Sequence, residues 1–176
     1  CRRLVSLDPC PMCEAGEGPD SMIALARLEG PLRHAVHRMK YGDRPQLAAP
    51  IVEATLLARR LAPGTLVPVP LHRVRRRWRG YNQAELLVRE IAARTSQPWL
   101  DALERGGARA PQVGRGGTAR REALAGAFRW QVALPLPAAV VIVDDVLTTG
   151  ATLLECARAA RAAGVGRVET LAIALG

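Results

Sequence analysis

Short apolar runs alternate with longer segments of helical periodicity along this chain of 176 residues. Apolar runs short enough for strands, one alternating and the others nearly continuous, occupy 22–28, 65–70, 138–143 and 168–174. Segments with apolar residues three or four positions apart, which predict amphipathic helices, occupy 32–39, 46–61, 82–95 and 150–163. Buried strands that alternate with helices indicate a parallel sheet covered on both faces, and therefore an α/β fold.

Length and composition favour one globular domain, which we assign to residues 21–176. Hydrophobic residues make up 49% of the chain, enough to build a core and to exclude fibrous and disordered classes. The longest apolar stretch, 132–143, contains two prolines and is far shorter than the ~18–20 residues of a membrane span. No signal-peptide pattern opens the sequence. We therefore expect a cytoplasmic protein without membrane insertion.

Three cysteines lie close together near the N-terminus, Cys1, Cys10 and Cys13. The C-x-x-C spacing of the last two is typical of a zinc knuckle. A structural zinc site needs four ligands, and because the chain begins with Cys we expect the fourth upstream. The alternative is a set of reduced thiols without metal. Residues 1–20 are accordingly interpreted as the remnant of a zinc-type segment and its linker, whereas Cys156 is expected in the core.

The most informative segment is Val140–Thr152, in which a buried strand is followed by the carboxylates Asp144 and Asp145. A small loop then opens a helix, whose unpaired N–H groups and dipole suit a phosphate. Gly150 lets the backbone approach a ligand closely, and hydroxyl donors are available from Thr148, Thr149 and Thr152. Carboxylates beside a phosphate suit sugar hydroxyls or a divalent cation. The segment therefore predicts a site for a phosphorylated sugar.

This run closely resembles the phosphoribosyl-pyrophosphate (PRPP) motif of type I phosphoribosyltransferases. Further motifs appear in the order seen in the competence-protein ComF family, which includes GntX-like proteins: Lys40-Tyr41-Gly42, Val67–Leu71, Arg79–Leu86, Arg109–Gln112 and Gly126-Ala127-Phe128. The cysteine knuckle also resembles this family, so the resemblance covers nearly the whole chain. One departure is Ala123, where the family pattern has asparagine.

The resemblance implies a type I phosphoribosyltransferase fold whose Asp144 and Asp145 contact the ribose 2′- and 3′-hydroxyls. It places the 5′-phosphate on Leu147, Thr148, Thr149, Gly150, Ala151 and Thr152. It places the pyrophosphate, with a bridging Mg²⁺, near Pro70, Leu71, His72, Arg79, Gly80, Tyr81, Asn82 and Gln83.

The implied function is Mg²⁺-dependent pentosyl transfer from PRPP, a reaction of nucleotide metabolism, in a protein that serves DNA uptake together with other competence proteins. The alternative is a non-catalytic DNA-binding or regulatory protein that uses the PRPP pocket as a sensor.

Arginines cluster at Arg73, Arg75, Arg76, Arg77 and Arg79, in a chain whose formal net charge is +9. Three interpretations stay open: pyrophosphate capture, single-stranded DNA binding with Trp78 or Tyr81 stacking on bases, and a solvated loop.

Other polar and aromatic residues carry weaker expectations. Lys40, the sole lysine, is either part of the family's site or a solvent-exposed structural residue. We expect His34 and His37 to be partly exposed and the Gly/Arg-rich stretch at 106–117 to be a mobile loop. Three aromatic residues are expected in the core, Trp99, Phe128 and Trp130.

Overall fold

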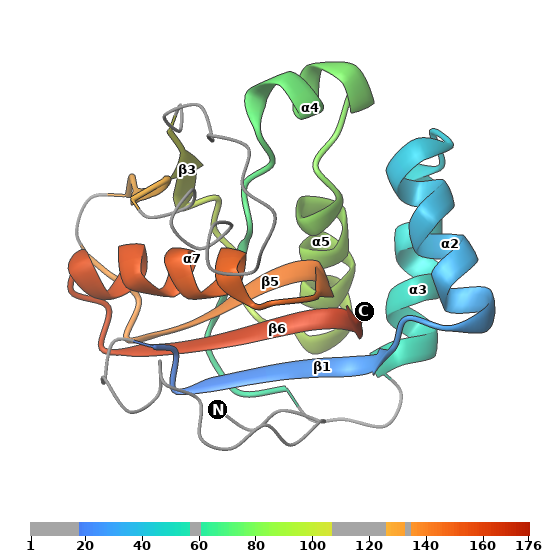
Figure 1. Cartoon of the computed structure of the whole chain (residues 1–176). Coiled ribbons are helices and arrows are strands. Elements are labelled where there is room, and N and C mark those ends of the chain that lie inside the picture. The colour runs from blue at the N-terminus through green and yellow to red at the C-terminus, as the bar shows by residue number, and fades with distance from the viewer. Residues whose placement is uncertain (1–17, 57–60, 107–125, 133–134) are drawn as a thin grey trace.

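A computed structural model describes residues 18–56, 61–106, 126–132 and 135–176 of the chain (Figure 1). The three N-terminal cysteines, Ala123 and nearly all of the Gly/Arg-rich stretch lie outside these ranges, so the predictions made for them remain predictions. None of the helices in the described ranges is long and apolar enough to cross a membrane.

A parallel sheet forms the centre of the described part of the chain. Its strands are β1 (Ser21–Arg27), β6 (Arg167–Leu175), β5 (Ala139–Leu147) and β2 (Thr65–Pro68), in that spatial order. Each strand runs parallel to its neighbour. The two central strands, β5 and β6, are covered on both faces, which explains why their sequences are almost continuously apolar.

Helices cover both faces of this sheet, as the sequence predicted (Figure 1). One face packs against α7 (Ala151–Ala162), and the other against α2 (Gly30–Tyr41), α3 (Ala48–Leu56) and α5 (Gln83–Thr95). The helix expected over 46–61 instead starts with a 3₁₀ turn, η1 (Pro45–Leu47), and α3 begins at Ala48. Pro50 has no N–H to donate and is tolerated only in the first turn of an α-helix, which fixes this start.

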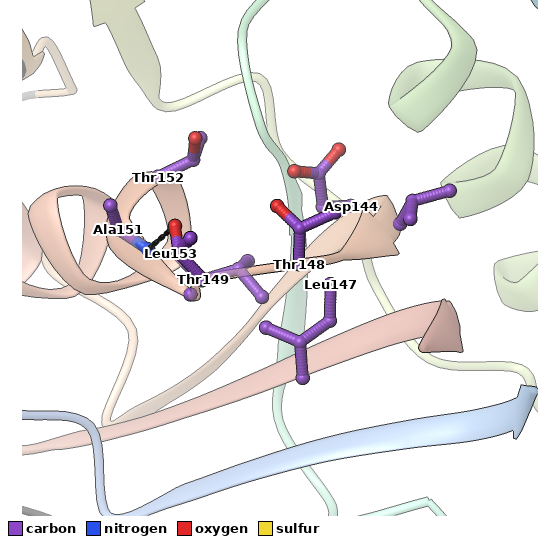
Figure 2. Close-up of a pocket in the computed structure, with 9 residues that line it drawn as sticks. Asp144, Leu147, Thr148, Thr149, Ala151, Thr152 and Leu153 are labelled. Carbon is purple, nitrogen blue, oxygen red and sulfur yellow. Dashed lines mark hydrogen bonds between the residues drawn. The ribbon is translucent and has the colours of Figure 1, made fainter. Parts of the chain in front are cut away.

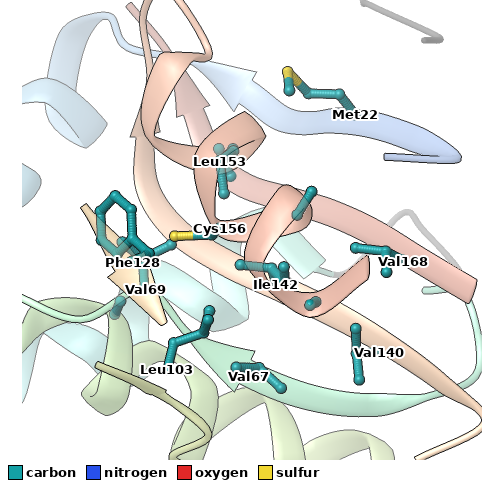
Figure 3. Close-up of a cluster of buried hydrophobic side chains, with 14 of the residues drawn as sticks. Met22, Val67, Val69, Leu103, Phe128, Val140, Ile142, Leu153, Cys156 and Val168 are labelled. Atoms are coloured by element: carbon teal, nitrogen blue, oxygen red, sulfur yellow. The ribbon is translucent and has the colours of Figure 1, made fainter. Parts of the chain in front are cut away.

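The pleat of β5 divides the core into two clusters. Val140 and Ile142 join the cluster under α7, which also contains Cys156 (Figure 3). Val141 and Val143 join the cluster under α2, α3 and α5. The expectation that Cys156 is a core residue is confirmed, since its side chain is fully buried. Because side chains alternate along a strand, the two residues that follow Val143 face opposite layers.

A small antiparallel pair, β3 (Leu103–Arg105) and β4 (Phe128–Trp130), packs beside α7. Phe128 is buried and Trp130 packs against the same core cluster, as expected. The expectation for Trp99 is wrong: it is 37% exposed, with the Arg89 guanidinium 5.0 Å from its ring centroid. Trp99 lies beside the edge strand β2, paired with Leu66, and no further strand within the described ranges covers its outer side.

The arginine cluster is a helix, α4 (Arg73–Arg79), and the interpretation of this run as a loop is wrong. The ring Nδ1 of His72 accepts a hydrogen bond from the N–H of Val74 (3.3 Å) and caps the first turn. Gly80 ends the helix with a φ of +78°, a conformation that favours glycine. Arginine is itself a good helix former, but with few apolar positions the run shows no amphipathic period that a sequence could reveal.

Asn82 joins the start of α5 to the end of β2. Its Oδ1 accepts from the N–H of Ala84 (3.2 Å), and its Nδ2 donates to the carbonyl of Val69 (3.0 Å). Asn82→Ala should lower the free energy of unfolding by about 2 kcal/mol, because it removes a cap and leaves a buried carbonyl unsatisfied. Urea unfolding measures this loss. Asn82→Ser, which retains a cap, should lose less, and equal losses in the two variants would contradict the capping role.

Candidate functional site

The acidic pair, Asp144 and Asp145, lies inside β5, just after the point at which the neighbouring strand β2 ends. Pro68, the last residue of β2, pairs with Val143. On the other edge β6 continues to pair with β5 as far as Leu147, so the strand does not stop before the acids. Asp144 and Asp145 therefore sit just beyond the end of β2, in the position where open α/β sheets form ligand crevices.

The loop that follows β5 forms a small polar recess of about 30 Å³ (Figure 2). Gly150, with a φ of +77°, turns the chain into α7, and a Cβ at this position would lie 3.1 Å from the Met22 sulfur. The N–H of Ala151 donates to the Thr149 hydroxyl (3.4 Å). The recess is lined by Asp144, Val146, Leu147, Thr148, Thr149, Gly150, Ala151, Thr152 and Leu153. The structure thus brings together all six residues expected to hold the 5′-phosphate, with Asp144 beside them.

Asp144 sits in an unfavourable setting for a negative charge. Burial raises the pKa of its carboxyl to about 7, and the charge of Asp145 adds to this rise. Lys40, Arg105 and a hydrogen bond from the Asp145 N–H to Asp144 Oδ1 (2.8 Å) act in the opposite direction. A perturbed carboxyl at the edge of a recess is typical of a functional site.

Asp145 is held by Lys40 on the opposite side of the strand. The Lys40 Nζ lies 2.9 Å from Asp145 Oδ1, and the side chains are only 22% and 12% exposed. The prediction of a solvent-exposed role for Lys40 is therefore wrong. Two adjacent residues of α2 also contact the Arg79–Gln83 segment: the Met39 carbonyl accepts from the Tyr81 hydroxyl (2.6 Å), and the Tyr41 ring centroid lies 4.9 Å from the Arg79 guanidinium.

The residues expected on the pyrophosphate side separate into three groups. Arg79 donates to Gln83 Oε1 (2.9 Å), and this group packs toward α2. Burial raises the pKa of the Tyr81 hydroxyl in the same region. His72 caps α4, and Gly80 ends it. The last group lines a separate cleft and consists of Pro70, Leu71 and Asn82.

This cleft, of about 220 Å³, lies between the end of β2, α4 and the β3–β4 pair. Besides Pro70, Leu71 and Asn82 it is lined by Arg73, Arg76, Asp101, Leu103, Glu104, Arg105 and Gln131. Burial lowers the pKa of Arg105, the charge of Arg75 adds to this fall, and Cys156 and Asp144 oppose it. Sequence reasoning missed Asp101, Glu104, Arg105 and Gln131, because no motif contains them and only folding brings them together.

The arginines of α4 fall into two classes. Arg73 pairs with Glu104 (2.5 Å) and Arg76 with Glu85 (3.6 Å), although their side chains remain 78% and 56% exposed. Arg75 and Arg77, the second class, are exposed as well. Between them on the helix surface lie Val74 and Trp78, one helical turn apart and 67% and 69% exposed.

His34 and His37 are exposed on α2, in line with the sequence. Across the described ranges, no group of three or more His, Cys, Asp or Glu side chains is placed to hold a metal ion.

Curated proteins of enteric bacteria and of Haemophilus are similar to most of the chain. The DNA utilization protein YhgH of Escherichia coli (strain K12) is 33% identical over 173 residues, which cover 92% of this chain and 75% of that protein. The protein of the same name from Salmonella typhi is equally similar over the same length. Competence protein F of Haemophilus influenzae is 30% identical over 167 residues, covering 88% and 72%. No protein-family model matches the chain.

The raised pKa of Asp144 makes a prediction for stability. The folded protein retains the Asp144 proton up to about pH 7, whereas the unfolded chain loses it near the ordinary value of 3.8. The free energy of unfolding of the wild type should therefore fall, relative to Asp144→Asn, as pH rises from about 4 to 8. Urea titrations of both proteins across this range measure the difference. Glu53→Gln, at an exposed position, is the control, and parallel curves for wild type and Asp144→Asn would contradict the shift.

Proposed function

The chain belongs to the ComF family, as its similarity to Competence protein F and to the YhgH proteins shows, and we propose that it is a PRPP-binding, Mg²⁺-dependent phosphoribosyltransferase-like protein that serves DNA uptake. The observation that carries the PRPP proposal is the position of Asp144 at the edge of the recess formed by the loop after β5. A carboxylate next to a helix start is the combination that a sugar phosphate requires.

The proposed binding mode assigns separate tasks to the residues of the site. Backbone N–H groups and hydroxyls of Thr148–Thr152 receive the 5′-phosphate, and Asp144 accepts a hydrogen bond from a ribose hydroxyl. Figure 2 supports this arrangement, since the carboxyl group of Asp144 and the hydroxyl of Thr148 lie on the same side of the loop. The cleft with Arg105 then lies on the pyrophosphate side.

The polar residues of the site fit a cation that is held mainly by the ligand. Mg²⁺ commonly binds through one or two carboxylates plus substrate phosphates, and the described residues contain no larger set of metal-ligating side chains. Bound in this way, Mg²⁺ would neutralise charge on the departing pyrophosphate. The protein's own contribution to pentosyl transfer is to orient the ribose and to present Arg105 near the leaving group.

Calorimetric titration of PRPP with Mg²⁺ tests this proposal. At pH 8, above the Asp144 pKa of about 7, the wild type should bind, and Asp144→Asn should weaken binding by about tenfold or more, because it removes a charged acceptor for a ribose hydroxyl. Glu53→Gln should bind like the wild type. Absence of binding to the wild type would refute the PRPP proposal. Measured pyrophosphate release in the presence of candidate bases then separates a transferase from a sensor, since a sensor binds PRPP without turnover.

Single-stranded DNA binding is the second candidate function, favoured by the exposed side of α4. Exposed Trp78 can stack on a base, while Arg75 and Arg77 can contact phosphates. Arg73 and Arg76 are instead paired with Glu104 and Glu85. The names of the relatives, a competence protein and DNA utilization proteins, support a nucleic-acid partner.

The two kinds of contact on α4 can be separated by salt dependence. Replacing Arg75 and Arg77 by Ala should weaken binding of a single-stranded oligonucleotide and reduce the slope of log K against log salt by about 0.7 per lost phosphate contact. Trp78→Ala should cost ~1–3 kcal/mol of binding energy with the slope unchanged. The matched control replaces Arg33 and Arg38, two exposed arginines of α2. A slope that is the same in all variants would rule out α4 as the binding surface.

A further inference from the structure

The acidic pair is divided between the two faces of the sheet. Val140 and Ile142 pack under α7 and Val141 and Val143 under the other helices, and the alternation continues into the pair. Asp144 lines the recess beside the start of α7. Asp145, which is 8% exposed, instead meets Lys40 of α2. The two adjacent carboxylates therefore have different partners, although the sequence presents them as equivalent.

Lys40 is fixed in place by its neighbours on the last turn of α2. The carbonyl of Met39 is bound by the Tyr81 hydroxyl, and the Tyr41 ring lies against the Arg79 guanidinium. Met39 itself is fully buried in the core cluster of this face. Contacts on both sides of Lys40 thus limit how far its ammonium can move from Asp145.

We propose that Lys40 is a positioning residue: it holds and neutralises the Asp145 carboxylate on the α2 face, so that Asp144 alone is presented to the sugar phosphate. This inference rests on the proposed PRPP function and divides the roles within its acidic pair. It follows from the distance of 2.9 Å, the low exposure of both groups and the opposite directions of the two carboxylates.

The low exposure of the pair gives the proposal a distinctive consequence. Removing one partner of a largely buried ion pair leaves an uncompensated charge, whereas replacing both partners by neutral groups is often tolerated. Lys40→Gln leaves the Asp145 charge next to Asp144, where it repels a charged ligand and disturbs the neighbouring carboxyl. Adding Asp145→Asn removes that charge and allows an amide–amide hydrogen bond in place of the ion pair.

The test is PRPP binding with Mg²⁺ by four proteins: wild type, Lys40→Gln, Lys40→Gln with Asp145→Asn, and Asp144→Asn. We expect Lys40→Gln to bind about tenfold more weakly than the wild type. The double variant should recover to within about threefold of the wild type, whereas Asp144→Asn should remain weak. Binding of inorganic pyrophosphate, which has no ribose, should change less than binding of PRPP in Lys40→Gln if the effect acts through the acidic pair.

A double variant that binds PRPP as weakly as Asp144→Asn would overturn the proposal, because Asp145 would then itself be required by the ligand. Unchanged binding in Lys40→Gln would overturn it as well.

A stability cycle on the wild type, Lys40→Gln, Asp145→Asn and the double variant keeps the inference separate from the proposed function. If the wild type does not bind PRPP, the proposed function is refuted, and so is the claim that Asp144 contacts the sugar phosphate. Thermal unfolding then tests the remaining claim, that Lys40 positions Asp145. A loss of stability in the double variant smaller than the sum of the two single losses supports the positioning, and additive losses refute it.

Discussion

Strand β5 remains paired with β6 beyond the point at which β2 ends, and this unequal pairing creates the candidate site. From Asp144 to Leu147 the strand stays paired with β6 on one edge, while the other edge is free of β2. Regular alternation then directs Asp144 to the α7 side and Asp145 to the α2 side. Had the strand ended at Val143, the two acids would lie on a loop without fixed directions.

The Lys40–Asp145 pair connects the sheet to the helical layer of α2 and α5. Motifs that are far apart in sequence meet here: the Lys40-Tyr41 segment, the Arg79–Gln83 segment and the acids of β5. Their side chains bind mainly to one another and to the backbone. Several residues that were expected to contact a ligand therefore make structural contacts that hold the site in place.

α4 carries two different surfaces on a single short helix. One side closes the cleft above the β3–β4 pair through Arg73 and Glu104, and the other exposes Val74 and Trp78. The net charge of +9 is a property of the whole chain and does not reveal this division. Arg105 lines the cleft and interacts electrostatically with Asp144. A small anionic ligand in the cleft and a long polyanion on the exposed surface of α4 would therefore contact different sides of this helix.

The sequence by itself determined the α/β class, the positions of the four parallel strands and of α2, α3, α5 and α7, and the recess residues 147–152, because each depends on local periodicity or on a contiguous motif. Tertiary structure decided what local patterns do not contain. It made a helix of Arg73–Arg79, exposed Trp99 beside an edge strand and placed Lys40 against Asp145. It also assembled Asp101, Glu104, Arg105 and Gln131 into one cleft. Those outcomes depend on which strand edges and helix faces meet, and contacts between distant segments leave no periodic signal in a single sequence.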